Sequence, residues 1–241
     1  MTLKRFSLIG SRIFATVIIA VVITIFGVLC FLPERTIYIN GGAAYGPIYS
    51  GNVSKPQIAL MFNVYENADI VNKIIEKLRD NGAIATFFVG GCWADDNTET
   101  LRNIVESGNE IANHGYFHSD HKKLSYEKNY EEISRCHDVV KALTGVDMNL
   151  FAPPSGAFGE NTLKAADKLG YKTVMWTVDT IDWRDSDEDV IFKRATENVV
   201  GGSLILMHPK AHTLNCLDRI LQYYKQKGMT CVTVSQCITY D

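Results

Sequence analysis

Apolar segments of strand length alternate with amphipathic segments of helix length through most of this 241-residue chain. The segments 57–64 (QIALMFNV), 85–90 (ATFFVG) and 203–209 (SLILMHP) are nearly continuous apolar runs, as expected of strands buried on both faces. Between the first two, residues 70–78 place apolar side chains at helical spacing. Because successive parallel strands need a helical crossover, this alternation predicts an α/β fold with a parallel sheet.

The same pattern predicts seven strands and six helices. Strands are expected at 57–64, 85–90, 110–115, 149–154, 172–179, 203–209 and 229–235. Helices are expected at 70–80, 98–107, 125–144, 161–169, 186–199 and 213–227. Asp69 is expected to cap the first helix. An open doubly wound sheet and a closed barrel both satisfy this order, and periodicity does not distinguish between them.

Residues 13–32 form an apolar run without a single charged side chain. At 1.5 Å per residue, a helix of this length spans a hydrocarbon core of roughly 30 Å. Lys4, Arg5 and Arg12 precede the run, so the positive-inside rule places residues 1–12 in the cytoplasm. A cleaved signal peptide would have a shorter apolar region and a small-residue cleavage site. We therefore expect a single-pass anchor in the cell membrane, with the C-terminal domain on the extracytoplasmic side.

Residues 33–55 are rich in glycine, proline and serine and are interpreted as a linker, followed by one domain at 56–241. The chain carries a net charge of −3, so it lacks the basic face typical of nucleic-acid binding, and no nucleic-acid partner is expected. The domain's cysteines show no paired spacing, so they are expected to be buried free thiols.

Polar side chains gather where the predicted strands end. Asn63, His114, Asp179 and His208 each lie at the carboxyl end of a strand, and the turn 153–156 (PPSG) follows another. In open parallel sheets and in barrels alike, ligands bind at that edge. The sequence therefore predicts one functional site built from these positions.

Two pairs within this group carry recognisable chemistry. His114 and His118 are four residues apart and can converge on one metal ion if the loop turns helically. Asp179 and Asp182 lie near His208, and either carboxylate can accept the imidazole N–H and fix its tautomer. One of the two aspartates is alternatively expected to cap the following helix. His121 is expected to be a solvated loop residue.

Taken in order, these segments resemble the motifs of the polysaccharide deacetylase family, also called the NodB-homology or carbohydrate esterase family 4 domain. The matching segments are 114–118 (HGYFH), 152–156 (APPSG), 179–183 (DTIDW) and 206–208 (LMH). The resemblance covers roughly residues 56–238 and is greatest to the sporulation-type branch. It implies a distorted (β/α)7 barrel.

The resemblance also implies a metal-dependent N-deacetylase. In this family a divalent metal, usually zinc, is held by two histidines, here His114 and His118, and one aspartate. The metal polarises an N-acetyl carbonyl while a second aspartate deprotonates water, and His208 then protonates the departing amine. The implied substrate is an N-acetylated cell-wall polysaccharide, either peptidoglycan or a chitin-like glycan. The implied substrate-binding residues are Pro154, Trp183 and Leu206.

Three positions depart from the family pattern. Asn63 occupies the position of the catalytic base, and a carboxamide has no basic site near neutral pH. Val64 occupies the position of the metal-binding aspartate, and Ala152 replaces an arginine. Glu66, Asp69 and Asp120 are candidate substitutes for the missing carboxylate.

Three functions therefore remain open on sequence grounds. The first is hydrolysis of N-acetyl groups on cell-wall glycan. The second is glycan binding, or a structural role in the cell or spore envelope, by a catalytically degenerate copy of the fold. The third is hydrolysis with His208 as general base and no tightly bound metal.

Overall fold

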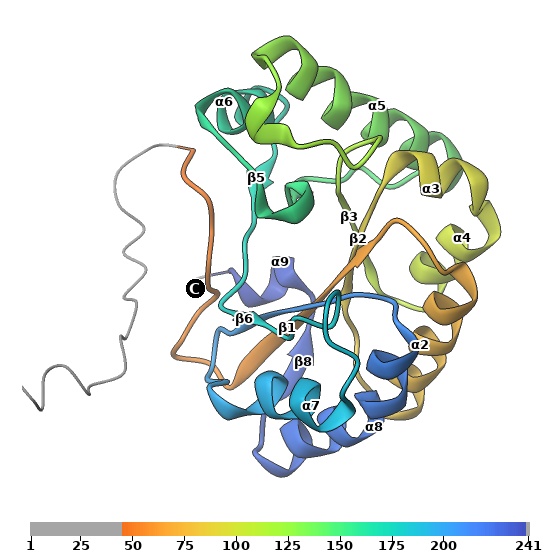
Figure 1. Ribbon diagram of the computed structural model, residues 1–241, viewed down its shortest axis with the longest axis vertical. Helices are drawn as coiled ribbons and strands as arrows, with labels where there is room; N and C mark the ends of the chain where they lie inside the picture. Colours follow the sequence, from red (N-terminus) through yellow and green to blue (C-terminus); the bar gives the residue numbers. More distant parts are fainter. Residues whose placement is uncertain (1–44, 240–241) are drawn as a thin grey trace, which may run out of the picture. The chain divides into compact units, whose positions relative to one another are not determined.

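The computed structural model describes residues 45–239, which form a curled parallel sheet with helices around its outer side (Figure 1). The sheet has the strand order β5-β4-β3-β2-β1-β7-β6, and β8 pairs with the start of β1. The strands are β1 (Gln57–Val64), β2 (Thr86–Val89), β3 (Glu110–Asn113), β4 (Leu150–Phe151), β5 (Lys172–Thr173), β6 (Val178–Asp179), β7 (Leu204–Met207) and β8 (Thr230–Val232). All of their pairings are parallel, as the alternating pattern predicts.

The helices follow the strands in alternation. They are α2 (Ala68–Asp80), α3 (Gly91–Asp96), α4 (Thr98–Glu106), α5 (Tyr126–Thr144), α6 (Glu160–Lys168), α7 (Glu188–Glu197), α8 (Ala211–Gln226) and α9 (Val234–Cys237), with short 3-10 turns η1 (His121–Lys123) and η2 (Pro154–Gly156). The short helices α3 and α9 were not predicted, because six and four residues are too few to show a periodic pattern.

The central strand β1 separates two apolar layers. Its residues Ile58, Leu60, Phe62 and Val64 pack into the core between the sheet and the outer helices. The alternate residues Ala59 and Met61 pack into a smaller core on the inner side of the curl. Because side chains alternate along a strand, Asn63 continues the inner series and Val64 the outer one. Because of this alternation, Asn63 can reach a site on the inner side of the curled sheet, whereas Val64 cannot.

The segment 172–179 is two short strands, and the prediction of one continuous strand is wrong. β5 pairs with β4, whereas β6 pairs with β7, so the two ends of the sheet's strand order are not bonded to each other. Ile48 lies beside this break: it forms a parallel bridge with Val174 and hydrogen-bonds to Thr173 and Met175 on either side. The structure therefore supports the α/β class and a curled parallel sheet, with an incomplete barrel closure.

The expected linker ends earlier than predicted. Like Ile48, two further residues of the expected linker bond to the domain. The backbone N–H of Gly51 donates to the carbonyl oxygen of Gly202, and that of Asn52 donates to the carbonyl oxygen of Cys237. Residues 48–52 are thus part of the domain, which the turn-rich composition concealed because these contacts are made through the backbone. Residues 33–44 of the expected linker and the predicted span at 13–32 lie outside the described residues. Within residues 45–239, no helix has the length and apolarity needed to cross a membrane.

Helix ends follow from local side-chain chemistry. Ser125 caps α5 by accepting from the Lys128 N–H, and Gly145, with φ of 76°, ends that helix. Asp69 is not a cap: α2 begins at Ala68 after Asn67, whose side chain donates instead to the carbonyl of Pro209. Cys92, Cys136, Cys216, Cys231 and Cys237 are free thiols, and Cys92 is exposed rather than buried as expected.

Candidate functional site

A cavity of about 220 Å³ opens at the carboxyl ends of the strands. It is lined by Asn63, Tyr65, His114, His118, Ser155, Trp176, Asp179, Trp183, Leu206 and His208. The structure thus brings together most of the residues singled out from the sequence. Asp182 and Pro154 are exceptions, since both are buried and do not line the cavity. Tyr65, Ser155 and Trp176 also line the cavity and were not predicted to do so. In the turn 153–156, it is Ser155 and not Pro154 that lines the cavity.

His114 follows directly after β3 and is buried. Its Nδ1 atom lies 2.8 Å from the carbonyl oxygen of Ala152, so Nδ1 carries the proton and donates it. Nε2 is left with a free lone pair and has no partner among the residues described. Burial, with a smaller contribution from His118, holds the pKa of His114 well below its usual value. The ring is therefore neutral, and its Nε2 is an acceptor.

His118 is presented by an unusual backbone. Its φ is 57°, in the left-handed region that non-glycine residues seldom adopt. The ring lies 5.2 Å from that of His114 and 4.2 Å from that of Tyr65, measured between centroids. Burial also lowers the pKa of His118. The two imidazoles thus both line one cavity, although the loop between them does not turn helically at Gly115 and His118.

The loop between the two histidines is held by side chains that the sequence did not reveal. Glu132 on α5 accepts hydrogen bonds at one carboxylate oxygen from the backbone N–H groups of Tyr116 (3.0 Å) and Phe117 (2.9 Å). Asn113 accepts from the N–H of Gly115 at 2.8 Å. A glutamate inside a helical pattern and next to another glutamate, Glu131, resembles a surface residue, so the sequence carried no signal of the role of Glu132.

His121 is fully buried, and the expectation of a solvated loop residue is wrong. Its Nδ1 atom is bonded to Oδ1 of Asn129 at 2.7 Å. Its Nε2 atom lies against Gly115, where an added Cβ would approach it to 2.7 Å. Gly115 has a φ of 75°, so both its backbone and its surroundings require glycine. His121 is therefore part of the support beneath the His114–His118 loop.

Asp182 is the aspartate that holds His208. Its Oδ1 lies 2.8 Å from Nδ1 of His208, and its Oδ2 accepts from the His208 backbone N–H and from the Thr213 hydroxyl, each at 2.7 Å. This bonding fixes the proton on Nδ1 and leaves Nε2 of His208 available to the cavity. Asp179 instead accepts from the N–H of Ile181 at 2.8 Å. Neither aspartate caps a helix, because Asp187 caps α7.

Residues 50–174 match the family model for polysaccharide deacetylases. The chain belongs to the polysaccharide deacetylase family. This assignment agrees with the resemblance drawn from its motifs, and the histidine loop 114–118 and the segment 152–156 lie within the matched range.

Two curated relatives show how far the polysaccharide deacetylase similarity extends. The uncharacterized protein YlxY of Bacillus subtilis is 35% identical over 190 residues, which is 79% of this chain and 60% of that protein. The chain thus spans less than two thirds of that relative. A peptidoglycan-N-acetylglucosamine deacetylase of Bacillus cereus is 31% identical over 195 residues, covering 79% of this chain and 71% of the enzyme.

A solved structure of a carbohydrate esterase family 4 pseudoenzyme from Bacillus anthracis superposes with a TM-score of 0.79 at 32% identity, covering 82% of this chain and 70% of that one. A mutant of that pseudoenzyme with restored enzymatic activity superposes equally well, at 0.79 and 30% identity, covering 82% and 72%. The family thus includes active deacetylases and at least one inactive member.

Asn63, which the resemblance of the motifs places at the position of the base, lines the cavity and is nearly fully buried. Its Oδ1 atom is buried and has no partner within residues 45–239. Oδ1 of Asn63 and Nε2 of His114 both accept hydrogen bonds, so neither can satisfy the other. A ligand that brings N–H or O–H donors would satisfy both.

The family's metal does not fit this donor set. Val64, where the resemblance of the motifs implies a third ligand, is fully buried in the outer core and turned away from the cavity. Within the described part of the chain, no three histidine, cysteine, aspartate or glutamate side chains are placed to hold a metal ion together. The two imidazoles remain as a pair of neutral nitrogen donors without an anionic partner.

The candidate substitute carboxylates lie elsewhere. Glu66 forms an ion pair with Lys210, and Asp120 pairs with Lys123 at the surface. Asp69 lies in the first turn of α2 and does not line the cavity. Among the residues that line the cavity, Asp179 supplies the one carboxylate. Ala152, in place of the family's arginine, contributes only its carbonyl oxygen to the site.

Proposed function

We propose that this protein binds N-acetylated cell-wall glycan in the cavity around Asn63 and His208 without hydrolysing it efficiently. The observation that carries this proposal is the carboxamide of Asn63 at the base position, buried in the cavity with its oxygen unpartnered. General-base catalysis requires a group that accepts a proton near neutral pH, and a carboxamide does not.

The cavity retains the features needed to bind an N-acetylated sugar. Trp183 is 52% exposed and offers an apolar ring face to a sugar ring. Nε2 of His114 can accept from an amide N–H, and Asp179 can accept from a hydroxyl group. Nε2 of His208, held in place through Asp182, adds another polar contact. The cavity therefore already contains the groups needed to bind an N-acetylated sugar.

The relatives support the choice of glycan. The Bacillus cereus relative is named a peptidoglycan-N-acetylglucosamine deacetylase, and a Bacillus subtilis relative at 29% identity is named a peptidoglycan-N-acetylmuramic acid deacetylase. The similarity to a pseudoenzyme of the same family supports a chain that keeps the fold and loses the reaction. The anchor at 13–32 belongs to this proposal, since it would hold the domain outside the membrane, beside the cell wall.

Deacetylation is the second candidate function. It is favoured by the hydrogen-bonded pair of Asp182 and His208, which is complete and suited to protonating a leaving amine. Water activation would then have to come from Asp179 or His208, because Asn63 cannot provide it.

One experiment separates the two functions. The full-length chain in detergent is incubated with peptidoglycan and with N-acetylglucosamine oligomers, with and without added Zn²⁺, and both binding and released acetate are measured. Saturable binding without acetate release supports the proposal. Catalytic acetate release would overturn it, and the absence of both binding and release would overturn the two functions together.

A further inference from the structure

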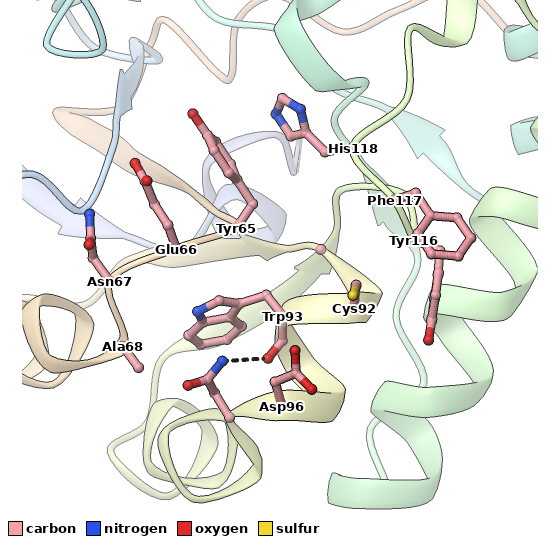
Figure 2. Close-up of a pocket in the computed structure, with 12 residues that line it drawn as sticks. Tyr65, Glu66, Asn67, Ala68, Cys92, Trp93, Asp96, Tyr116, Phe117 and His118 are labelled. Carbon is pink, nitrogen blue, oxygen red and sulfur yellow. Dashed lines mark hydrogen bonds between the residues drawn. The ribbon is translucent and has the colours of Figure 1, made fainter.

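A second and larger cavity, of about 480 Å³, adjoins the first. Tyr65 and His118 line both cavities and separate them. Figure 2 shows the indole of Trp93 in the middle of this second pocket, with Tyr65 and Glu66 above it, Asp96 below it, and Tyr116 and Phe117 to the right. A chain molecule in the first cavity can therefore extend into the second past the edge formed by Tyr65 and His118.

The charges around the second pocket are unbalanced. Glu66 and Asp96 line it, and Glu66 is paired with Lys210. Asp96 is exposed and forms no ion pair with any residue in the range 45–239. Among residues 45–239, no lysine or arginine lines the pocket itself, although Lys210 pairs with Glu66 and Arg135 lies behind the Tyr116 and Phe117 rings. A cationic group would find the unpaired carboxylate of Asp96 here.

Aromatic rings supply a second reason to expect a cation. Phe117 is 59% exposed and lies 4.6 Å from Tyr116 between ring centroids, and Trp93 and Tyr65 line the same pocket. The guanidinium of Arg135 already lies 3.8 Å from the centre of the Tyr116 ring and 5.1 Å from that of Phe117, on the side of α5. Aromatic faces combined with a carboxylate are the surroundings in which proteins bind ammonium groups.

Trp93 adds a specific hydrogen-bonding requirement. The residue is only 6% exposed, and its indole N–H has no acceptor among the described residues. A buried N–H without a partner costs free energy that a ligand hydroxyl or ring oxygen would recover. The pocket therefore suits a ligand that carries both an ammonium group and hydroxyl oxygens.

We propose that the second pocket binds a hexosamine unit whose amino group is free, next to an N-acetylated unit held in the first cavity. The protein would then recognise partly deacetylated glycan, the product of a deacetylation reaction. This inference rests on the proposed function, because the first cavity must hold a glycan for its neighbouring unit to reach Asp96.

The test compares two oligosaccharides on the full-length chain in detergent by calorimetry. One is a β-1,4-linked tetramer of N-acetylglucosamine, and the other is the same tetramer with a single unit deacetylated. The deacetylated tetramer is expected to bind about threefold to fivefold more tightly, the range typical of an exposed ion pair. The preference should fall when NaCl is raised, because salt screens exposed charges.

A matched pair of variants locates the effect. Asp96→Asn is expected to abolish the preference, whereas Asp95→Asn, which changes the neighbouring exposed aspartate outside the pocket, should leave it intact. Equal binding of both tetramers, or a preference that survives in Asp96→Asn or at high salt, overturns this inference while the proposed function stands. Failure to bind either tetramer overturns the proposed function as well.

Discussion

Asp182 accepts two hydrogen bonds from the same residue, His208, one from the ring Nδ1 at 2.8 Å and one from the backbone N–H at 2.7 Å. The carboxylate thus fixes both the tautomer of the ring and the backbone position from which the ring projects. Thr213 donates a third hydrogen bond to the same group. His208, anchored by this carboxylate, thus lines a cavity that is also lined by the carboxamide of Asn63.

Removing the charge of Asp182 should destabilise the fold. In Asp182→Asn, one carboxylate oxygen is replaced by an NH₂ group, which cannot accept the one or two hydrogen bonds made to that oxygen. Because the site is buried, we expect a loss of about 2 kcal/mol in the free energy of unfolding, measured with urea. Thr213→Val, which removes one donor, should lose about 1 kcal/mol. An unchanged stability in Asp182→Asn would show that the hydrogen bonds to this carboxylate contribute little.

Glu132 should be required for the His114–His118 loop. Glu132→Ala leaves two backbone N–H groups without an acceptor, so a loss of about 2–4 kcal/mol in unfolding free energy is expected. Glycan affinity should fall as well, because the loop carries His118 into the cavity.

The neighbouring Glu131 provides the control for that experiment. Its side chain is exposed and, within residues 45–239, forms an ion pair with Lys128 on the same helix, so Glu131→Ala should change stability by less than about 1 kcal/mol. Equal effects of the two alanine substitutions would mean that Glu132 acts through helix propensity rather than through the loop.

Trp183 should matter for ligand binding and not for folding. Its side chain is 52% exposed and lines the first cavity. We expect Trp183→Ala to weaken binding of N-acetylglucosamine oligomers about tenfold, the effect of losing one exposed aromatic anchor, with an unchanged unfolding midpoint. Unaltered affinity would place the glycan elsewhere on the protein.

His121 should make stability depend on pH. Burial lowers its pKa below the ordinary value of 6.5, so the unfolded chain takes up a proton there more readily than the folded one. The contribution of His121 to the free energy of unfolding is fully present above about pH 6.5 and is lost as the pH falls below that value. Urea unfolding between pH 7.5 and 5.5 should show the decline, and His121→Gln should reduce its slope. An identical slope in the variant would contradict this assignment.

The sequence predicted the class of fold and most of the residues that line the first cavity, because both depend on local patterns. Continuous apolar runs identified β1 and β7, and the carboxyl ends of parallel strands placed Asn63, His114 and His208 on one edge. The break between β5 and β6 was not predictable, because its backbone is completed by Ile48, far away in the sequence.

The supporting residues of the site were hidden for a similar reason. Glu132 lies in the middle of a helical pattern, and only the tertiary contact between α5 and the histidine loop gives it a role. Asp179 and Asp182 were equivalent candidates in the sequence, and their different orientations were needed to show which one holds His208.

The central claim is that Asn63 is what leaves the site without a base. The most direct test is acetate release from N-acetylglucosamine oligomers by the full-length chain and by Asn63→Asp, measured both with and without added Zn²⁺, because the described residues do not complete a metal site. The substitution returns a carboxylate to the cavity that holds His114, His118 and His208, so release is expected to rise by about 100-fold or more over the unmodified chain. Equal rates in the two proteins, whether both release acetate or neither does, would contradict the claim.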